Sequence, residues 1–290
     1  MQVMEAPRIC ADDYGLAPGV DRAIRSLVAD RRLDAVSVMA LFSDLENEIA
    51  ALANVSGPCL IGLHFTLTDH PPLGAMNKMS RAGRLPSLGR LLALAYARQL
   101  DGAEIAAELE RQFDRLAAAL GRKPDFIDGH QHVQALPVVR EAVLALARRH
   151  DVPVRMIEPP PTAASAALPA RFKAAMLGWM GRRLSVAAGD RAFNRGFLGV
   201  RSFREDEPYR ALFRRWLAAA APGSLVMCHP GIPDEVLAAR DPVTTARAEE
   251  FAYLSGPDYL ADRAERAATS DSYSRSCKTG IKGRSAGGIG

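Results

Sequence analysis

The fold is decided by a short apolar run that ends in two adjacent carboxylates, Arg8-Ile9-Cys10-Ala11-Asp12-Asp13-Tyr14-Gly15. An apolar run that stops at a turn glycine is typical of a buried strand. Neighbouring carboxylates repel each other unless a cation or a proton separates their roles, so the pair suggests a metal ligand beside a general base. An ordinary turn or helix N-cap is the competing interpretation, because the same residues serve both purposes.

The composition is that of an ordinary globular protein. The chain has 290 residues, of which 48% are hydrophobic and 24% charged, so it can bury a large core. Most of its net charge of +4 lies in the tail, where Arg275, Lys278, Lys282 and Arg284 face the single acid Asp271. The body is therefore nearly neutral, and no basic groove and no nucleic-acid partner is expected.

The cysteines and the N-terminus predict a cytoplasmic protein. Cys10, Cys59, Cys228 and Cys277 form no CxxC pair, so free thiols are expected. The first residues lack a basic segment followed by an apolar one, and no stretch reaches the roughly 18 apolar residues that span a bilayer. We therefore expect no stable membrane insertion. A homodimer is the default expectation for the assembly.

Strand patterns alternate with helix patterns along residues 8–229. Helices are predicted over 103–120, 137–150 and from Pro208 to before Pro222, the first with a capping box at Asp101 and Glu104 and a stop at Gly121. The predicted strands cover 8–13, 35–41, 60–67, 125–130, 154–158 and 224–229. This alternation predicts an α/β fold with a parallel sheet, either open or closed into a barrel.

Three stretches break this rhythm. Residues 69–87 and 158–170 are rich in proline and read as long loops after strands, where α/β folds build their sites. The tail 269–290 is rich in glycine, serine and basic residues and is expected to be disordered, which leaves 1–268 as one folded domain.

Four of the six histidines fall at or just after predicted strand ends. His64 shares the small, polar face of its strand, and His130 and His132 lie on one side if the chain there stays extended. His229 ends the last strand, just before Pro230. Structural explanations stay open for each: a hydrogen-bonded core histidine for His64, and chance surface histidines for the His-x-His pair. The remaining two, His70 and His150, are expected to have structural roles.

A carboxylate and two imidazoles from separate strands are a recurrent ligand set for a catalytic divalent ion. Asp13, His64 and His130 can supply it. Asp12 is then free to take a proton from metal-bound water, and His229 is placed to protonate a leaving group. All five lie at C-terminal strand ends, the usual edge for an α/β active site.

With these residues in view, the chain resembles the YdjC-like carbohydrate deacetylase family, which includes chitooligosaccharide deacetylases and hopanoid-biosynthesis-associated members. Four motifs in family order carry the resemblance, and they span most of residues 8–256. They are Ala11-Asp12-Asp13-Tyr14-Gly15-Leu16-Ala17-Pro18-Gly19-Val20, Gly62-Leu63-His64-Phe65-Thr66-Leu67-Thr68, Asp128-Gly129-His130-Gln131-His132-Val133 and Met227-Cys228-His229-Pro230-Gly231.

The resemblance implies an irregular, TIM-like (β/α) barrel and one divalent metal ion, magnesium or zinc. Asp13, His64 and His130 would hold the metal, with Asp12 as general base and His229 as general acid. The implied role of His132 is either to support a ligand or to bind substrate. One departure is Gln134, which stands where family members often have a third histidine.

The implied reaction is removal of an acetyl group from an N-acetylated sugar or glycolipid. A phosphoesterase or a non-haem iron enzyme with the same ligands is an alternative, although the sequence shows no clear cluster of arginines for phosphate. A glycosidase would leave the histidines unexplained. A sugar-binding protein without catalysis on the same scaffold is the alternative from another class.

Overall fold

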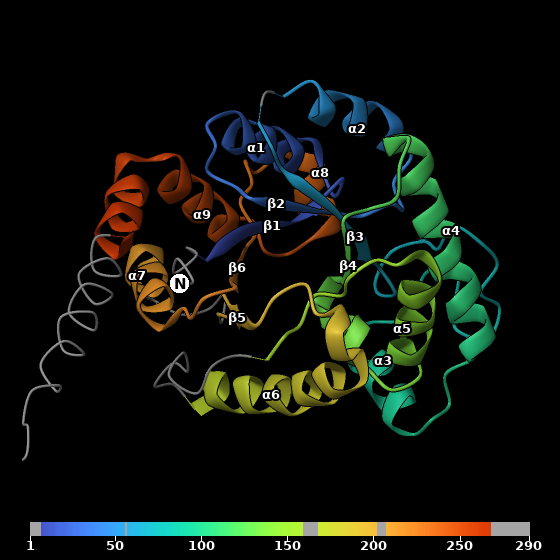
Figure 1. Cartoon of the computed structure of the whole chain (residues 1–290). Coiled ribbons are helices and arrows are strands. Elements are labelled where there is room, and N and C mark those ends of the chain that lie inside the picture. Colours follow the sequence, from blue (N-terminus) through green and yellow to red (C-terminus); the bar gives the residue numbers. More distant parts are fainter. Residues whose placement is uncertain (1–6, 56, 159–167, 202–206, 268–290) are drawn as a thin grey trace, which may run out of the picture.

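The computed structural model describes residues 7–55, 57–158, 168–201 and 207–267 of the chain (Figure 1). Six parallel strands form one curled sheet in the order β4-β3-β2-β1-β6-β5. The strands are β1 (Arg8–Tyr14), β2 (Ala35–Val38), β3 (Leu60–Phe65), β4 (Phe126–Gly129), β5 (Gly196–Leu198) and β6 (Ser224–Cys228). The predicted barrel-like α/β fold is confirmed.

Helices surround the sheet on its outer side (Figure 1). They are α1 (Pro18–Ala29), α2 (Leu45–Ala53), α3 (Leu88–Tyr96), α4 (Gly102–Leu120), α5 (Val139–His150), α6 (Leu168–Ala188), α7 (Tyr209–Ala219), α8 (Glu235–Arg240) and α9 (Thr245–Ser255), with short 3-10 turns η1 (His130–Ala135) and η3 (Gly189–Arg191). Residues 257–267 are also helical. In the described part of the chain, none of the helices is long and apolar enough to cross a bilayer.

The gap between the edge strands β4 and β5 is bridged by residues 153–158. Val154 forms isolated parallel bridges to Ile127 in β4 and to Ala192, just before β5. Stacked rings support the same closure, because Phe126 of β4 and Phe193 lie 4.3 Å apart at 14°. The sheet therefore curls almost into a ring. A regular strand was predicted at 154–158, but the structure shows only these isolated bridges there.

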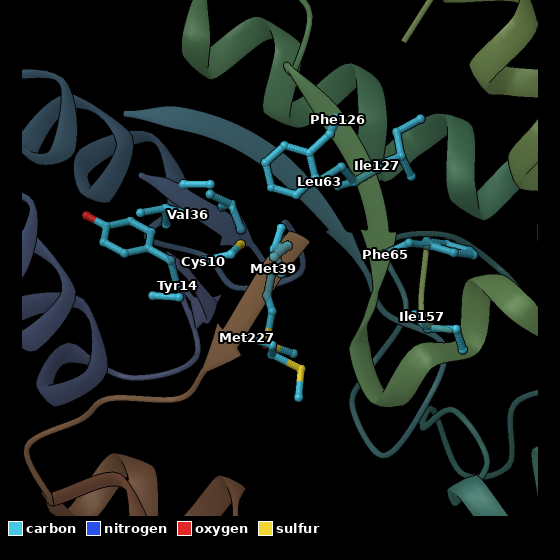
Figure 2. Packing of buried hydrophobic residues seen from close by; sticks show 14 of the residues in the cluster. Cys10, Tyr14, Val36, Met39, Leu63, Phe65, Phe126, Ile127, Ile157 and Met227 are labelled. Carbon is cyan, nitrogen blue, oxygen red and sulfur yellow. The ribbon is translucent and has the colours of Figure 1, made fainter. Parts of the chain in front are cut away.

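The core fills the inside of this ring as well as the space under the helices (Figure 2). Gly62 in β3 has no side chain, and the ring of Phe126 occupies the space where one would lie: a Cβ on Gly62 would stand 2.3 Å from Phe126 Cε2. The strands are buried on both faces, which explains their near-continuous apolar runs. Most of the polar exceptions, His64 among them, lie toward the C-terminal ends of the strands, whereas Ser224 begins β6.

Local signals set the helix ends only in part. Asp101 caps α4 by accepting hydrogen bonds from the N–H groups of Ala103 and Glu104, and Gly121 ends it with a left-handed φ of 65°. The second half of the predicted capping box is not formed: the Glu104 carboxylate accepts a bond from the Lys78 N–H instead. It thereby holds the 69–87 loop against α4.

Other bounds differ modestly from the prediction. The helix predicted over 137–150 begins at Val139, because η1 and Val138, with a φ of 71°, come first. Strand β5 was not predicted, since its three residues are too few to show alternation. The tail 269–290, the domain end at 268 and most of the 158–170 loop lie outside the described residues.

Candidate active site

The paired carboxylates lie on a bulge at the end of β1. Ala11 pairs with Val36 and Tyr14 with Val38, so β1 uses one more residue than β2 between these pairs. Asp13 has a left-handed φ of 69° there. In a regular strand the two neighbouring side chains would point to opposite faces, but the bulge lets both line the same cavity.

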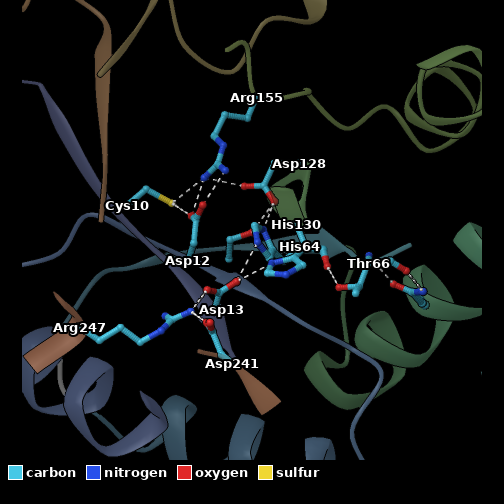
Figure 3. A network of polar contacts seen from close by, with 12 residues as sticks. Cys10, Asp12, Asp13, His64, Thr66, Asp128, His130, Arg155, Asp241 and Arg247 are labelled. Carbon is cyan, nitrogen blue, oxygen red and sulfur yellow. Dashed lines mark hydrogen bonds and ion pairs between the residues drawn. The ribbon is translucent and has the colours of Figure 1, made fainter. Parts of the chain in front are cut away.

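Asp13, His64 and His130 converge as the sequence predicted (Figure 3). Asp13 Oδ1 lies 3.1 Å from His64 Nε2 and 3.0 Å from His130 Nδ1. The three candidate ligand atoms all lie within 4.8 Å of one another. The strand ends of β1, β3 and β4 are thus the scaffold of a group that could hold a metal ion.

The tautomer of His64 is set by Asp128, which binds the ring nitrogen that does not face Asp13. His64 Nδ1 lies 2.6 Å from Asp128 Oδ1, which also accepts a hydrogen bond from Ser37 Oγ at 2.6 Å. Because Nδ1–H donates to this carboxylate, a neutral His64 turns the lone pair of Nε2 toward Asp13. Two acceptors this close repel each other unless a proton or a metal ion lies between them. The residues therefore fit a cation.

The charges around His64 also favour a cation at this position. Burial lowers the pKa of His64, but the carboxylates of Asp128 and Asp12 raise it more, to about 10. Without a metal ion, the ring is therefore protonated at neutral pH. A site that holds an extra proton this firmly also attracts a divalent cation, which would displace that proton.

Asp12 is held by Arg155, which comes from the segment that bridges β4 and β5. Arg155 Nη1 and Nη2 lie 2.6 Å and 2.7 Å from the two oxygens of Asp12, and Nη1 lies 2.9 Å from Asp128 Oδ2. Burial raises the pKa of Asp12, but Arg155 and His64 lower it further, to about 2. Asp12 is thus ionised across the physiological range and fixed in one orientation.

The second oxygen of Asp13 is bound by Arg247 of α9. Arg247 Nη2 lies 2.6 Å from Asp13 Oδ2 and also bonds Asp241. Burial raises the pKa of Asp13, and Arg247 and His130 together hold it well below its usual value. Arg247 therefore leaves only Oδ1 of Asp13 to face the two imidazoles.

His229 lies at the end of β6 and lines the same cavity as Asp12 and Asp13. Its backbone N–H donates to Glu250 Oε2 at 2.6 Å. Burial lowers the pKa of His229 to about 4, although the two aspartates oppose this. The resting imidazole is therefore neutral at pH 7, and it must gain a proton before it can act as an acid.

The cavity itself has a volume of about 610 Å³ and opens above the C-terminal strand ends. Besides the predicted residues it is lined by four arginines, brought together from loops and helices far apart in the chain: Arg84, Arg201, Arg240 and Arg247. No local sequence pattern predicted this cluster. Two of the four are balanced by acids, because Arg201 lies 3.1 Å from Glu249 and Arg247 binds Asp13.

A family model described as YdjC-like protein matches residues 8–265. The chain belongs to the YdjC-like protein family. It is 39% identical over 148 residues to proteins named chitooligosaccharide deacetylase from Yersinia pestis (strain Pestoides F) and Yersinia pseudotuberculosis (serotype O:1b, strain IP 31758), and the match covers 50% of this chain and 57% of each relative. The matched part thus spans little more than half the length of these curated relatives.

A solved structure from Enterococcus faecalis V583, named a "putative cellobiose-phosphate cleavage protein", has the same fold. The two superpose with a TM-score of 0.70 at 20% identity, over 90% of this YdjC-like chain and 94% of that one. This likeness concerns the fold alone.

The turn after β4 differs from its predicted form. Gln131 and His132 both have left-handed φ values, 54° and 62°, so the chain there is not extended, contrary to the prediction. Even so, His130 and His132 both line the cavity. Gln134 is fully buried with Nε2 3.5 Å from the Arg155 carbonyl oxygen, and it is not among the described residues that line the cavity.

Three residues of the site were missed from the sequence. Asp128 stands inside the quoted third motif but was given no role, and Arg155 is the one charged residue in an apolar run, Val154-Arg155-Met156-Ile157, which is the signal that could have found it. Arg247 carries no such signal, because it lies in an ordinary helix. His70, expected to be structural, lines the cavity with its ring centre 6.3 Å from that of His130.

Proposed function

We propose that this protein is a metal-dependent deacetylase that removes the acetyl group from an N-acetylated sugar. The observation that carries the proposal is the convergence of Asp13 Oδ1, His64 Nε2 and His130 Nδ1 in a cavity that Asp12 and His229 also line. The names of the Yersinia relatives point to the same chemistry. Acetate and a free amine would be the products.

Asp13, His64 and His130 would hold one divalent ion. Such an ion polarises the amide carbonyl and lowers the pKa of a bound water. Two imidazoles with one carboxylate are typical of zinc and of similar transition metals, whereas magnesium prefers oxygen ligands. Zinc is therefore the better match for this donor set, with magnesium as the second candidate.

The remaining steps fall to the side chains around this group. Asp12 is ionised and oriented by Arg155, so it can accept a proton from the attacking water as the new C–O bond forms. The C–N bond then breaks, and the amine nitrogen needs a proton to leave. His229 lines the same cavity and, as a neutral imidazole, would take from Asp12 the proton that came from the water and deliver it to the amine nitrogen, which leaves Asp12 ionised again.

A phosphoesterase is the second candidate, and Arg84 and Arg240 are the observation that favours it. Both line the cavity, and neither forms an ion pair with the described residues. A phosphate group would be attracted by two such guanidinium groups. The acetamido substrate remains the first choice, because the curated relatives carry a deacetylase name.

The test measures acetate and phosphate release in parallel. Purified protein is treated with a chelator, reloaded with zinc or magnesium, and incubated with N-acetylated sugars, N-acetylated glycolipids and sugar phosphates. Acetate release that disappears with the chelator and returns with metal supports the proposal. Phosphate release without acetate release supports the second candidate, and tight metal binding with no product supports a sugar-binding protein.

Asp13→Asn and Asp69→Asn form a matched pair for this assay. Both aspartates line the cavity and both have a left-handed φ, 69° and 59°, which asparagine tolerates. Only Asp13 contributes an atom to the ligand group. Asp13→Asn should lose metal binding and acetate release together while Asp69→Asn keeps both, and full activity in metal-free Asp13→Asn would refute the scheme.

We also propose a cytoplasmic location, supported by the thiols of Cys10, Cys59 and Cys228, which are free. Fractionation of cells that express the full chain would test it. The expected homodimer remains a prediction for light scattering in solution.

A further inference from the structure

Helix α6 concentrates positive charge. Its 21 residues include Arg171, Lys173, Arg182 and Arg183 and no acidic residue. Away from the C-terminal tail, the chain as a whole is nearly neutral, so this helix is an exception. None of these four residues has a place in the proposed reaction.

Residues 175–188 of α6 have two distinct faces. Its buried face consists of Leu177, Met180, Leu184 and Ala188. The opposite face carries residues spaced i, i+3, i+4 and i+7, which lie on one side of a helix. These are Trp179, which is 41% exposed, Arg182, Arg183 and Val186, which is 85% exposed.

Aromatic and basic groups are interleaved on this face. The Arg183 guanidinium lies 4.6 Å from the centre of the Trp179 ring, and the exposed Tyr96 ring of α3 lies 5.8 Å from the same tryptophan. Arg182 forms an ion pair with Glu158 at 3.7 Å. Within the described residues, Arg183 makes no ion pair.

The positive surface continues onto α5 through a groove of about 590 Å³. Arg140 and Arg148 of α5 line it together with Arg182, Arg183 and Val186 of α6. Arg140 is paired with Glu141 at 2.8 Å, whereas the exposed Arg148 has no acidic partner among the residues described. The groove therefore carries a clear excess of positive charge.

We propose that the surface formed by Trp179, Arg182, Arg183, Val186 and Arg148 docks on an anionic phospholipid bilayer. Arginines that flank an exposed tryptophan and valine on one helix face are the combination by which peripheral helices bind lipid headgroups, with the apolar side chains entering the headgroup region. A nucleic acid would be attracted by the same arginines but offers no apolar phase for Val186. No helix insertion across the bilayer is involved.

The helix that carries the docking surface packs close to the catalytic cavity. α6 packs against η1, the turn that carries His130 and His132. A bilayer bound to α6 would therefore lie on the side of the molecule where η1 is found. The surface is nevertheless separate from the reaction, and its test needs no substrate.

The experiment is sedimentation of the full chain with phosphatidylcholine vesicles, with and without phosphatidylglycerol. We expect binding only to the anionic vesicles, weakened by salt. The pair Arg182→Gln and Arg183→Gln should reduce partition about 30-fold, because each basic side chain near such a surface contributes about fivefold. The control pair Arg22→Gln and Arg31→Gln, on exposed arginines of and next to α1, should leave it unchanged.

Fluorescence locates the contact. The chain has two tryptophans, and Trp216 is 1% exposed, so brominated lipids should quench Trp179 alone. Quenching should disappear in Trp179→Phe. Binding to anionic vesicles that survives the Arg182 and Arg183 changes would overturn the proposal and assign the affinity to the basic tail. Binding to RNA but not to vesicles, or to neither, would also overturn it.

Discussion

Replacing Arg155 with methionine should be the most damaging single change near the site. Arg155 is fully buried and binds both Asp12 and Asp128, which are themselves buried. Arg155→Met keeps most of the side-chain volume but leaves two carboxylates without their cation. Removing one partner from a buried ion pair costs about 3–5 kcal/mol, because the remaining charge stays desolvated. Urea unfolding followed by circular dichroism measures this loss.

The pH dependence distinguishes an electrostatic loss from poor packing. In the native protein the pKa of Asp12 is about 2, below its value in the unfolded chain. This group therefore contributes stability that is present above about pH 4 and is lost as the pH falls toward 2, about 2 kcal/mol in all. In Arg155→Met burial still raises the pKa of Asp12 while the largest group that lowers it is gone, so this pKa should be higher than in the native protein. The difference in free energy of unfolding between variant and native protein should therefore narrow as the pH falls from 7 to 4.

Two controls complete the experiment. Arg148→Met removes an exposed arginine and should change the free energy of unfolding by less than about 0.5 kcal/mol. Combining Arg155→Met with Asp12→Asn should cost less than the sum of the single changes, because Asn carries no charge to leave unpaired. A cost below about 1 kcal/mol for Arg155→Met, or a cost that is the same at pH 7 and pH 4, would refute the reasoning.

Three further changes have distinct readouts. Arg247→Met frees the carboxylate of Asp13, the proposed metal ligand, to rotate and should weaken zinc binding about 10-fold to 100-fold in a chelator competition. Unchanged affinity would contradict the positioning role of Arg247. His70→Asn should raise KM about fivefold with little change in kcat, as expected for the loss of one hydrogen bond to substrate, and a fall in kcat alone would argue against substrate contact. Gly62→Ala places a Cβ against the Phe126 ring and should lower the free energy of unfolding by about 1–3 kcal/mol. As a control, a Cβ on Gly89 would have no atom within 4 Å, so Gly89→Ala should not destabilise the protein.

The order of strands and helices was predictable because it depends on local patterns. About twenty consecutive residues contain all the signals for α4: its 3.6-residue period, its Asp101 cap and its Gly121 stop. The C-terminal strand edge of the site follows from the same order, since parallel strands all end on one side. These signals were enough to predict that Asp13, His64 and His130 lie close together.

Other features depend on contacts between distant parts of the chain. Arg155 reaches Asp12 across 143 positions, and Arg247 reaches Asp13 across 234. No local pattern records such pairs, because each residue by itself fits a strand end or a helix equally well. The closure through Val154 and the cluster of cavity arginines belong to the same class.

The sequence by itself therefore determined the parallel α/β framework, the edge that carries the site, and the carboxylate and imidazoles that meet there. Only the tertiary structure decided how the two aspartates differ. The bulge in β1 turns both toward the cavity, Arg155 holds Asp12, and Arg247 leaves a single oxygen of Asp13 facing the imidazoles. The physical reason is that a carboxylate's pKa and orientation are set by the charges packed around it, and packing brings those charges from far along the chain.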